Sequence, residues 1–378
     1  MMFYLYYLSQ GPNAIAGGFN VFQYVSFRAV CAAITAFLLC LVFGNWVIRK
    51  LTSLKFGQPI RTADEVHRLY ELHGAKKGTP TMGGVFFMGS VVVSTIIWAR
   101  PDNGFVWLCV FTIFFTAGLG LVDDYLKVTK KKSEGVPGRV KLICQFILAA
   151  IVTGFFLLNP SLEVQAKELY IPFFKEPIIA NLGWFTLLFF AIVIVGTSNA
   201  VNLTDGLDGL ATGCTVTVAS TYAILAYAAG NVAVSTYLDL PFYRESQELT
   251  ILCTALAGAG LGFLWFNCHP AKVFMGDTGS LSIGGTLGVV AICCKQELLL
   301  IVIGGIFVIE ALSVILQVLS FKLTGKRILL MSPLHHHFEL VGWPETTVIV
   351  RFWILAGLFA ALGLGLFYAD FLSVTGLR

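Results

Sequence analysis

The sequence predicts an all-α integral membrane protein with about ten transmembrane helices. Hydrophobic residues make up 57% of the 378 residues, and charged residues make up only 12%. Many of the apolar residues lie in runs of about 20, the length that a helix needs to cross a bilayer. This composition excludes a disordered chain, a collagen-like fibre and a secreted disulfide scaffold. A net charge of +4 is too small for a soluble nucleic-acid binder, so we expect no nucleic-acid partner.

Ten apolar segments are candidate membrane spans, and two of them are unusual. The eighth is short and rich in glycine, and the ninth contains Gly304, Gly305 and then Glu310, which predicts a bent or broken helix. Outside the spans, residues 160–181 combine β-prone pieces with charged breaks and predict a small external β-hairpin. The ten segments cover residues 22–45, 79–99, 104–122, 142–159, 183–202, 209–230, 249–268, 278–294, 298–321 and 348–369.

The positive charges predict how the chain is oriented in the membrane. Odd-numbered connections between spans carry 17 of the 25 Lys and Arg residues, whereas even-numbered connections and the C-terminus carry 6. Because Lys and Arg are enriched on the cytoplasmic side, the odd connections are expected to be cytoplasmic and both termini external. We therefore expect residues 1–378 to form a single polytopic membrane domain. Its active site is expected in five cytoplasmic loops, at about 46–78, 123–141, 203–208, 269–277 and 322–347.

The cysteines and the N-terminus show no sign of a secreted protein. All nine cysteines lie in or beside apolar runs, where free thiols behave as small hydrophobic side chains. The first positive charge is Arg28, so the N-terminal segment is expected to be an amphipathic lead-in to the first span and not a cleaved signal peptide.

Aspartates in the cytoplasmic loops indicate a cation site. Asp123 and Asp124 come at the end of an apolar helix, where the helix dipole disfavours negative charge unless a cation offsets it. Asp205, Asp208 and Asp277 add further carboxylate oxygens on the same face of the membrane. A site rich in oxygen ligands favours Mg²⁺, with Mn²⁺ as a substitute. The alternative is that each aspartate only caps a helix, which is reasonable for one of them but not for all five.

Glycines and lysines in the same loops favour a phosphate ligand. Glycine lets backbone N–H groups approach an anion, and helix N-termini attract negative charge. Lys76, Lys77 and Lys127 can neutralise phosphate, whereas Lys130, Lys131 and Lys132 are explained by membrane orientation alone. The spacing of a Walker phosphate-binding loop does not occur.

Three further features are open to two interpretations each. Consecutive His335, His336 and His337 cannot all face one ion from a regular helix, so a phosphate-contacting or structural cluster is favoured over a zinc site. Glu310 within a span is either functional or paired with a neighbouring helix. Phe274 either stacks on a base ring or is an aromatic residue of the membrane interface.

One string of residues in each cytoplasmic loop resembles the phospho-N-acetylmuramoyl-pentapeptide transferase family. This family is part of the polyprenyl-phosphate N-acetylhexosamine-1-phosphate transferase superfamily. The strings are KKGTPTMGG at 76–84, LVDDYLK at 121–127, NAVNLTDGLDGLA at 199–211, NCHPAKVFMGDTGSL at 267–281 and PLHHHFE at 333–339. The resemblance implies an enzyme of the bacterial cytoplasmic (inner) membrane with ten transmembrane helices, external termini, a broken ninth helix and a homodimeric assembly among membrane lipids.

The resemblance also implies the reaction and its residues. The enzyme would transfer phospho-MurNAc-pentapeptide from UDP-MurNAc-pentapeptide to undecaprenyl phosphate with Mg²⁺, giving lipid I and UMP. Asp277 would be the principal Mg²⁺ ligand, and Asp123 and Asp124 would be catalytic, one of them activating the lipid phosphate. The three histidines His335, His336 and His337 would contact the moving or leaving phosphate. The substrate-binding residues would be Lys76, Thr81, Lys127, Asn199, Asn202, Asp205, Asp208, Asn267 and Phe274, with Phe274 stacking on uracil.

The sequence leaves open two alternative functions and two questions about the reaction mechanism. A sister enzyme that transfers N-acetylglucosamine-1-phosphate to the same kind of lipid would share the aspartate motifs. A secondary transporter would use Glu310 and the broken ninth helix as an ion pathway, although transporters usually bind substrate near the midplane and often contain repeats. We favour direct attack by the lipid phosphate over a covalent enzyme intermediate, because this phosphate is already largely ionised near neutral pH. Which of Asp123 and Asp124 acts on that phosphate is not determined by the sequence.

Overall fold

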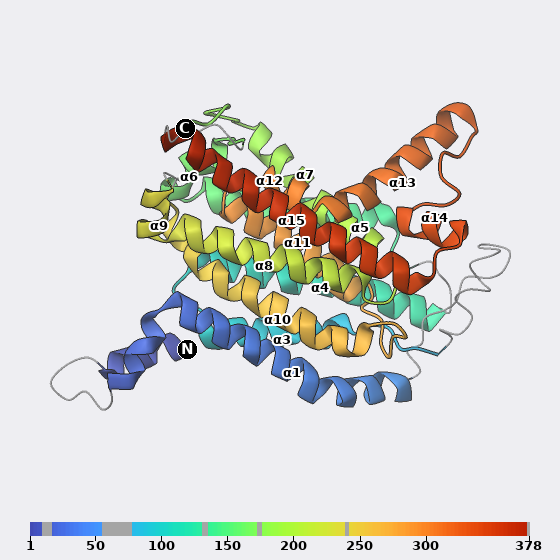
Figure 1. The fold of residues 1–378 in the computed structure, drawn as a ribbon, viewed down its shortest axis with the longest axis horizontal. Helices are drawn as coiled ribbons and strands as arrows, with labels where there is room; N and C mark the ends of the chain where they lie inside the picture. The colour runs from blue at the N-terminus through green and yellow to red at the C-terminus, as the bar shows by residue number, and fades with distance from the viewer. Residues whose placement is uncertain (10–16, 55–77, 131–134, 172–175, 239–241, 376–378) are drawn as a thin grey trace.

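The computed structural model describes residues 1–9, 17–54, 78–130, 135–171, 176–238 and 242–375. These residues form a bundle of helices that run along a common long direction (Figure 1). The prediction of an all-α fold is therefore confirmed. Nine of the ten predicted apolar segments form one helix each, and the ninth forms two consecutive helices. The helix ends lie within a few residues of the predicted ones, apart from some extensions into the loops.

The helices differ in length and in their suitability as membrane spans. Eight helices in the described part of the chain are long and apolar enough to cross a membrane, whereas α3 and α11 have 15 and 17 residues. The long helices are α1 (Val25–Ser53), α3 (Gly84–Trp98), α4 (Gly104–Lys130), α5 (Gly138–Leu157), α7 (Phe185–Thr204), α8 (Leu210–Gly230), α10 (Leu249–Asn267), α11 (Asp277–Cys293), α13 (Gly305–Thr324) and α15 (Glu345–Thr375). The short ones are η1 (Met2–Ser9), η2 (Gly17–Gln23), α6 (Pro160–Lys167), α9 (Val232–Tyr237), η4 (Arg244–Glu248), α12 (Leu299–Ile303) and α14 (Leu334–Val341).

Helix α11 is the centre of the bundle. Every residue from Thr278 to Cys293 is buried, and the helix packs mainly against α4, α7 and α3. Its glycines allow this close packing: a Cβ atom on Gly284 would lie 2.4 Å from the carbonyl oxygen of Thr197 on α7. Because α11 is central, its first residue, Asp277, lies in the middle of one end of the bundle.

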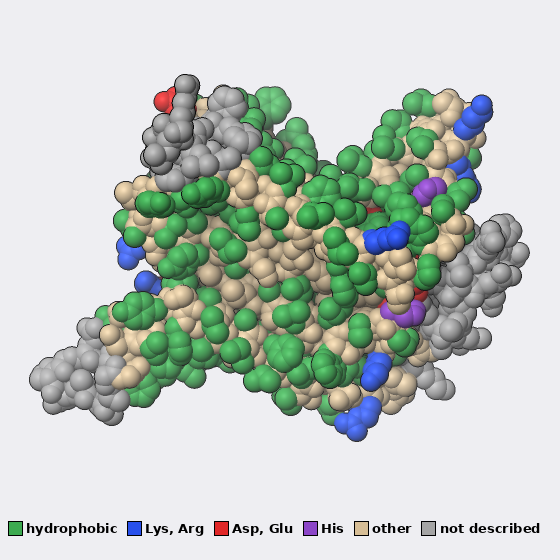
Figure 2. Space-filling model, in the orientation of Figure 1, with side chains coloured by type: hydrophobic (Ala, Val, Ile, Leu, Met, Phe, Trp, Pro, Cys, Tyr) green, Lys and Arg blue, Asp and Glu red, His purple; other side chains and the backbone are tan. Residues whose placement is uncertain are grey.

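The outer surface of the bundle is apolar. Figure 2 shows hydrophobic side chains over the middle of the molecule, with Lys, Arg and His side chains toward the ends. On α13, for example, Leu312, Ile315, Leu316 and Leu319 are all exposed. A soluble protein rarely exposes contiguous apolar surface of this extent, whereas a helix that faces lipid must.

The ninth predicted segment is interrupted as expected. Helix α12 ends at Ile303, and α13 begins at Gly305 and leaves the bundle at an angle (Figure 1). Glycine at this point permits close packing, since a Cβ atom on Gly305 would lie 2.7 Å from the ring of Phe359 on α15. The break therefore occurs where the neighbouring helix is packed against the backbone.

The predicted external β-hairpin near 160–181 is not what the described residues form. Residues Pro160–Lys167 are the helix α6, and a single antiparallel bridge joins Leu169 to Ile179; residues 172–175 lie outside the described ranges. The helix begins because Asn159 caps it through a hydrogen bond from the Ser161 N–H at 3.2 Å, and Pro160 occupies the first helical position. The helix thus replaces only the first part of the predicted hairpin.

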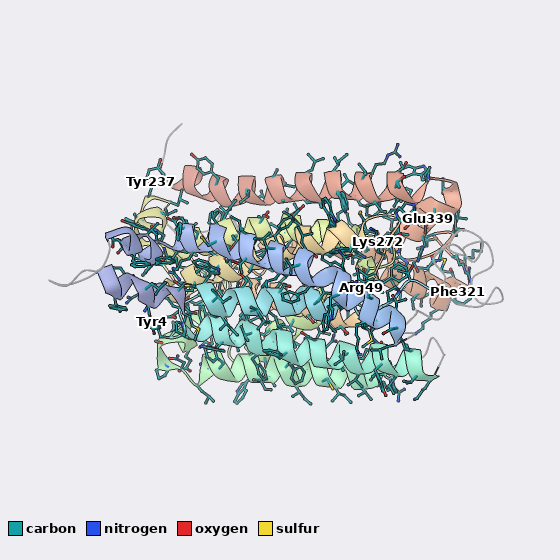
Figure 3. The ribbon with its side chains drawn as sticks, turned by 90° about the horizontal axis from the view of Figure 1, so that it is seen from below. Tyr4, Arg49, Tyr237, Lys272, Phe321 and Glu339 are labelled. Atoms are coloured by element: carbon teal, nitrogen blue, oxygen red, sulfur yellow. The ribbon has the colours of Figure 1, made fainter. Side chains whose placement is uncertain are left out.

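Different parts of the chain lie at the two ends of the bundle. The N-terminus and the C-terminal end of α15 lie at one end, and α14 lies at the other (Figure 1). Figure 3 shows Tyr4 and Tyr237 at the first end, and Arg49, Lys272 and Glu339 at the second. The residues of the predicted odd-numbered loops that the structure describes thus share one end. Most of the predicted first loop, residues 55–77, lies outside the described ranges.

Candidate active site

Three aspartates from two helices meet at the α14 end of the bundle. Asp123 and Asp124 belong to α4, and Asp277 is the first residue of α11. One carboxylate oxygen from each lies within 4.8 Å of the others. Asp123 is 0% exposed and Asp124 is 3% exposed. Asp277 is half-buried. Three carboxylates this close repel one another unless positive charge or hydrogen bonds compensate them.

Asp124 is compensated by the N-terminus of α11. Its carboxylate accepts hydrogen bonds from the N–H groups of Asp277 at 3.1 Å and Thr278 at 3.0 Å, and from the Thr278 hydroxyl at 2.8 Å. The expectation that the aspartate pair ends its helix is wrong, because α4 continues to Lys130. Instead of facing the unfavourable dipole of its own helix, Asp124 caps another helix, where the dipole favours negative charge.

Asp123 and Asp277 share two lysines. The Nζ atom of Lys127 lies 2.6 Å from Asp123 Oδ2 and 3.2 Å from Asp277 Oδ2. The Nζ atom of Lys141, on α5, lies 2.9 Å from Asp123 Oδ1 and 2.6 Å from Asp277 Oδ2. Asp123 also accepts the Val136 N–H at 2.7 Å. The two lysine side chains thus offset most of the negative charge of these carboxylates.

Lys141 was not predicted to be a site residue. In the sequence it contributes only to the cytoplasmic positive charge, because the approach of α5 to α4 and α11 is a matter of tertiary packing. Lys127 had a local signal, since it follows Asp123 by four residues on one helix and so lies on the same face.

The last turn of α7 and the loop after it, 205–209, bring two more predicted residues to the cluster. The Asn202 amide donates to Asp277 Oδ1 at 3.0 Å and to Ser280 Oγ at 2.9 Å. Asp205 follows the end of α7. Burial raises the pKa of Asp205 well above its ordinary value, and the nearby carboxylates of Asp277 and Asp124 raise it further, while the Gly276 N–H partly opposes them.

We expect Asp205→Asn to separate stability from activity. A carboxyl group whose pKa is raised in the folded protein stabilises the fold only while it is protonated, so that contribution is lost as the pH rises through the folded pKa. At pH 8 the neutral amide should therefore melt at an equal or higher temperature than wild type, although turnover falls by about 10-fold or more. Thermal melting and product release in the same detergent test this. A lower melting temperature would contradict the assigned cause of the shift.

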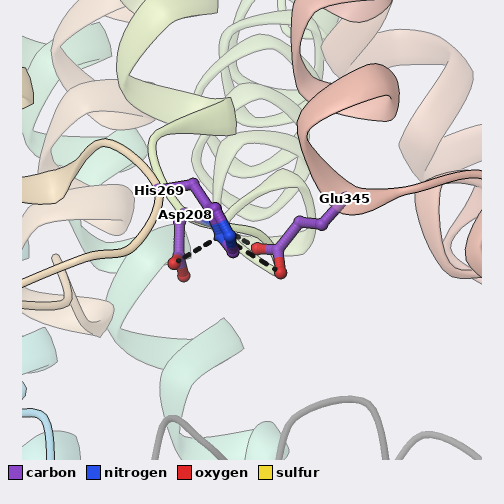
Figure 4. A group of neighbouring side chains, drawn as sticks. All are labelled: Asp208, His269 and Glu345. Carbon is purple, nitrogen blue, oxygen red and sulfur yellow. Dashed lines mark hydrogen bonds and ion pairs between the residues drawn. The ribbon is translucent and has the colours of Figure 1, made fainter.

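A second group of side chains joins the neighbouring loops. The Nδ1 atom of His269 lies 3.2 Å from Asp208 Oδ2 and 3.5 Å from Glu345 Oε2 (Figure 4). Asp208 Oδ2 also accepts the Ala271 N–H at 3.0 Å, and the Asp208 N–H donates to Glu345 Oε1 at 3.1 Å. These contacts tie the predicted loop residue Asp208 to the loop before α11 and to the start of α15. His269 and Glu345 carried no recognisable signal in the sequence.

Two predicted amides lie away from the carboxylate cluster and serve the packing around it. Asn267 is 2% exposed; it donates to the Val273 carbonyl at 2.9 Å and accepts the Thr212 hydroxyl at 2.8 Å. Asn199 donates to Gln145 Oε1 on α5 and to the carbonyl of Val195, each at 2.8 Å. These hydrogen bonds thus hold the loop before α11 and the α5–α7 interface.

The segment before α3 runs beside the loop that precedes α11. Phe274 donates its N–H to the Pro80 carbonyl at 2.8 Å and accepts the Gly83 N–H at 2.9 Å. Thr81 in this segment is buried, whereas Phe274 is half-buried. Two predicted substrate-binding residues are therefore neighbours through backbone pairing. Lys76, a third one from this segment, lies outside the described residues.

The three consecutive histidines have three different partners. His335 Nδ1 lies 3.1 Å from Glu310 Oε2, and His336 Nδ1 lies 2.7 Å from Glu339 Oε2. His337 Nδ1 accepts the Leu330 N–H at 3.2 Å. In the described part of the chain, none of these three belongs to a group arranged to hold a metal ion. This geometry does not favour the zinc alternative.

Glycine at position 120 allows the cluster to form. A Cβ atom there would lie 2.3 Å from the carbonyl oxygen of Asp277, so α4 touches the backbone of α11 directly. We expect Gly120→Ala to push α4 away from α11, lowering turnover by about 10-fold or more and lowering the melting temperature. Gly118→Ala is the matched control, since nothing lies within 4 Å of its Cβ position. Equal behaviour of the two variants would contradict this account.

Among the residues that the structure describes, two groups of side chains have donors suited to a divalent cation. Asp123, Asp124 and Asp277 offer oxygen only, which suits a hard cation such as Mg²⁺. Asp208, His269 and Glu345 include a nitrogen donor, which suits softer metals better. The all-oxygen group also has basic side chains beside it that can bind phosphate. Its residues therefore fit a metal–phosphate site.

Comparison with known proteins gives concordant results. Residues 106–295 match the model of glycosyl transferase family 4, and residues 76–88 match signature 1 of the phospho-N-acetylmuramoyl-pentapeptide-transferases. The chain is 54% identical over 364 residues to the protein of that name from Methylacidiphilum infernorum (isolate V4), covering 96% of this chain and 98% of the relative. It is 49% identical over 361 residues to the one from Syntrophus aciditrophicus (strain SB), covering 95% and 98%.

Proposed function

The chain belongs to the phospho-N-acetylmuramoyl-pentapeptide transferase family, and we propose that it transfers phospho-MurNAc-pentapeptide from UDP-MurNAc-pentapeptide to undecaprenyl phosphate, giving lipid I and UMP. One observation of the structure carries this proposal furthest. The buried Asp123 of α4 and the half-buried Asp277 of α11 meet two lysines at one end of a bundle of apolar helices. A soluble diphosphate and a phosphate on a long apolar tail can meet only at such a boundary.

The proposed cofactor is Mg²⁺, with Mn²⁺ as a substitute, and Asp277 is its proposed principal ligand. The oxygen-only donor set of the three aspartates supports this choice. When bound, the cation neutralises charge on the diphosphate and its leaving group. Lys127 and Lys141 are placed to bind the same phosphates, because both Nζ atoms already contact carboxylates of this cluster.

We assign different tasks to the two catalytic aspartates. Both oxygens of Asp124 accept hydrogen bonds from the first turn of α11, so Asp124 holds Asp277 in place. Asp123 is held mainly by ion pairs with Lys127 and Lys141. These lysines can release Asp123 and bind phosphate in its place, so we propose that Asp123 is the residue that acts on the lipid phosphate. The phosphate oxygen of the lipid attacks the sugar-linked phosphorus, the bond to the bridging oxygen breaks, and UMP leaves with the electron pair. Positioning and charge neutralisation dominate this reaction, which favours direct displacement.

The remaining predicted residues are proposed to line the nucleotide, sugar and phosphate sites. Phe274 is proposed to stack on uracil, and Thr81, in the segment paired with it, is proposed to contact the same substrate. The half-buried His336 and His337 are proposed to contact the moving or leaving phosphate, together with the buried His335. The substrate-binding set is Lys76, Thr81, Lys127, Asn199, Asn202, Asp205, Asp208, Asn267 and Phe274, of which Asn199 and Asn267 act through the packing of the loops.

We propose that the protein crosses the bacterial inner membrane ten times, with the site on the cytoplasmic face and both termini external. Eight described helices have the length and composition of spans, and α3 and α11 would be the remaining two. The two termini lie at the end of the bundle opposite the carboxylate cluster, which supports this orientation (Figure 1). The exposed apolar surface is proposed to contact membrane lipids and a second copy of the chain in a homodimer.

The test is UMP release by the purified protein with UDP-MurNAc-pentapeptide and undecaprenyl phosphate, in Mg²⁺ or in chelator. Release that needs both substrates and the metal supports the proposal. Release from UDP-GlcNAc alone would show the sister activity, which the names of the two relatives do not favour. Flux into liposomes without nucleotide chemistry would show a transporter.

A further inference from the structure

Glu310 is a buried carboxylate within a helix whose other side chains are largely exposed and apolar. It is 0% exposed, whereas Leu312 and Ile315 on the same helix α13 are exposed. A carboxylate at this depth is costly unless it is well paired. Its partners therefore indicate what it does for the protein.

The carboxylate of Glu310 caps helix α14, which carries the three histidines. It accepts the N–H of Leu334 at 2.9 Å and the N–H of His335 at 3.2 Å. These are N–H groups of the first turn of α14, which have no partner within their own helix. Seven residues later on α13, Gln317 accepts the N–H groups of Ile328 and Leu329 at 3.0 Å and 2.9 Å. The loop before α14 is thus held at two points along one helix.

The ring of His335 is enclosed between Glu310 and loop 205–209. Both side chains are 0% exposed, and His335 Nδ1 faces Glu310 Oε2 at 3.1 Å. On the other side, a Cβ atom on Gly206 would lie 2.2 Å from His335 Nε2. The ring therefore fills the space that a side chain at position 206 would take. His336 and His337 differ, because their partners Glu339 and Leu330 belong to the same loop region.

We propose that Glu310 is a positioning residue that sets loop 205–209 through His335. Glu310 holds the start of α14 and faces the Nδ1 edge of the His335 ring. The Nε2 edge of the ring then packs against Gly206, which lies between the proposed substrate ligands Asp205 and Asp208. A partner behind an imidazole commonly fixes the ring's orientation in this way. This inference rests on the proposed function, since those aspartates are assigned there to the nucleotide substrate.

The first test compares Glu310→Gln with wild type. The amide retains one acceptor oxygen but cannot accept on its nitrogen, so part of the contact to α14 is lost. We expect faster deuterium exchange in peptides covering 328–341. We also expect the KM for UDP-MurNAc-pentapeptide to rise about 10-fold, a typical effect of losing such a partner, while the KM for undecaprenyl phosphate changes by less than about 2-fold. A purely structural loss would not separate the two KM values.

Glu248→Gln is the matched control, because Glu248 is another buried carboxylate. It pairs with Arg28 at 2.6 Å and accepts the Arg100 N–H at 2.9 Å. Glu248 precedes α10, and the other end of α10, at Asn267, lies near the site. Because the 19 residues of α10 span about 28 Å, Glu248 is about one helix length away from the site. This variant should melt at a lower temperature with both KM values unchanged. If it raised the nucleotide KM as much as Glu310→Gln does, general destabilisation would explain the effect and the proposal would fail.

A second variant, Gly206→Ala, alters the contact between His335 and loop 205–209 at the loop. Gly206 has no left-handed φ that would forbid a side chain, so Gly206→Ala strains only its contacts, the nearest of which is His335 Nε2. It should raise the nucleotide KM in the same way, and it decides the question alone if Glu310→Gln does not fold. Wild-type KM values in Gly206→Ala, or wild-type exchange and KM values in Glu310→Gln, would overturn the proposal. Wild-type protein that releases no UMP would instead refute the proposed function, and the exchange measurement would still test the contact.

Discussion

Asp277→Asn is expected to lower UMP release by at least about 100-fold while the protein remains folded. Asp277 contacts Lys127, Lys141 and Asn202. The amide keeps the shape of the side chain but removes the negative charge on which the proposed cation site depends. Turnover at saturating substrate and Mg²⁺, with the melting temperature measured in the same detergent, checks this expectation.

The control for Asp277→Asn is the loss of a carboxylate elsewhere. Glu163 pairs with Lys167 on α6, and its side chain is 44% exposed. Because exposed pairs contribute little, Glu163→Gln should retain the wild-type rate and melting temperature. An Asp277→Asn protein with near-wild-type turnover would refute the assigned role of Asp277. A protein that fails to melt cooperatively would show that Asp277 serves the fold, and the proposed role would then need another ligand.

Lys141→Met is expected to have the second largest effect. The Lys141 ammonium lies between Asp123 and Asp277, and its removal leaves Lys127 as the lysine that contacts both carboxylates. Electrostatic repulsion then increases, and one proposed phosphate contact is lost. We expect turnover to fall by about 100-fold, and the free energy of unfolding to fall by about 1–3 kcal/mol because a buried hydrogen-bonded partner is removed. Product release and thermal melting measure the two losses.

Lys130→Met is the matched control for this prediction. Lys130 ends α4 at the same end of the bundle, but it is exposed. If the cluster geometry matters and not the overall positive charge, Lys130→Met should behave as wild type. Equal losses in the two lysine variants would show that Lys141 contributes only to the general charge of this face.

The composition and the apolar runs were enough to predict the fold class. Apolar runs of about 20 residues are a local property, and each of the ten predicted segments is helical in the structure, the ninth as two helices. The gathering of Asp123, Asp124 and Asp277 at one end of the bundle also followed from the sequence, because alternate connections of a bundle of spans must lie on the same side. The break of the ninth segment followed from a glycine pair.

Other features were decided by tertiary packing. Lys141 lies 136 residues from Asp277 in the chain, and nothing local in the sequence brings α5 to α11. The sequence placed Asp124 at the unfavourable end of its own helix, whereas the structure uses it to cap α11. Asp208, His269 and Glu345 come from three separate segments and meet only after folding.

The division has a simple physical reason. Whether a segment is helical depends mainly on residues within about 20 positions. The amino-acid sequence of this protein therefore determined its helix pattern and which loops share one end of the bundle. Which charge neutralises which depends on distances of a few ångströms between helices that are remote in the chain. Those distances are set by close packing, as where Gly120 meets Asp277, and only the tertiary structure decides them.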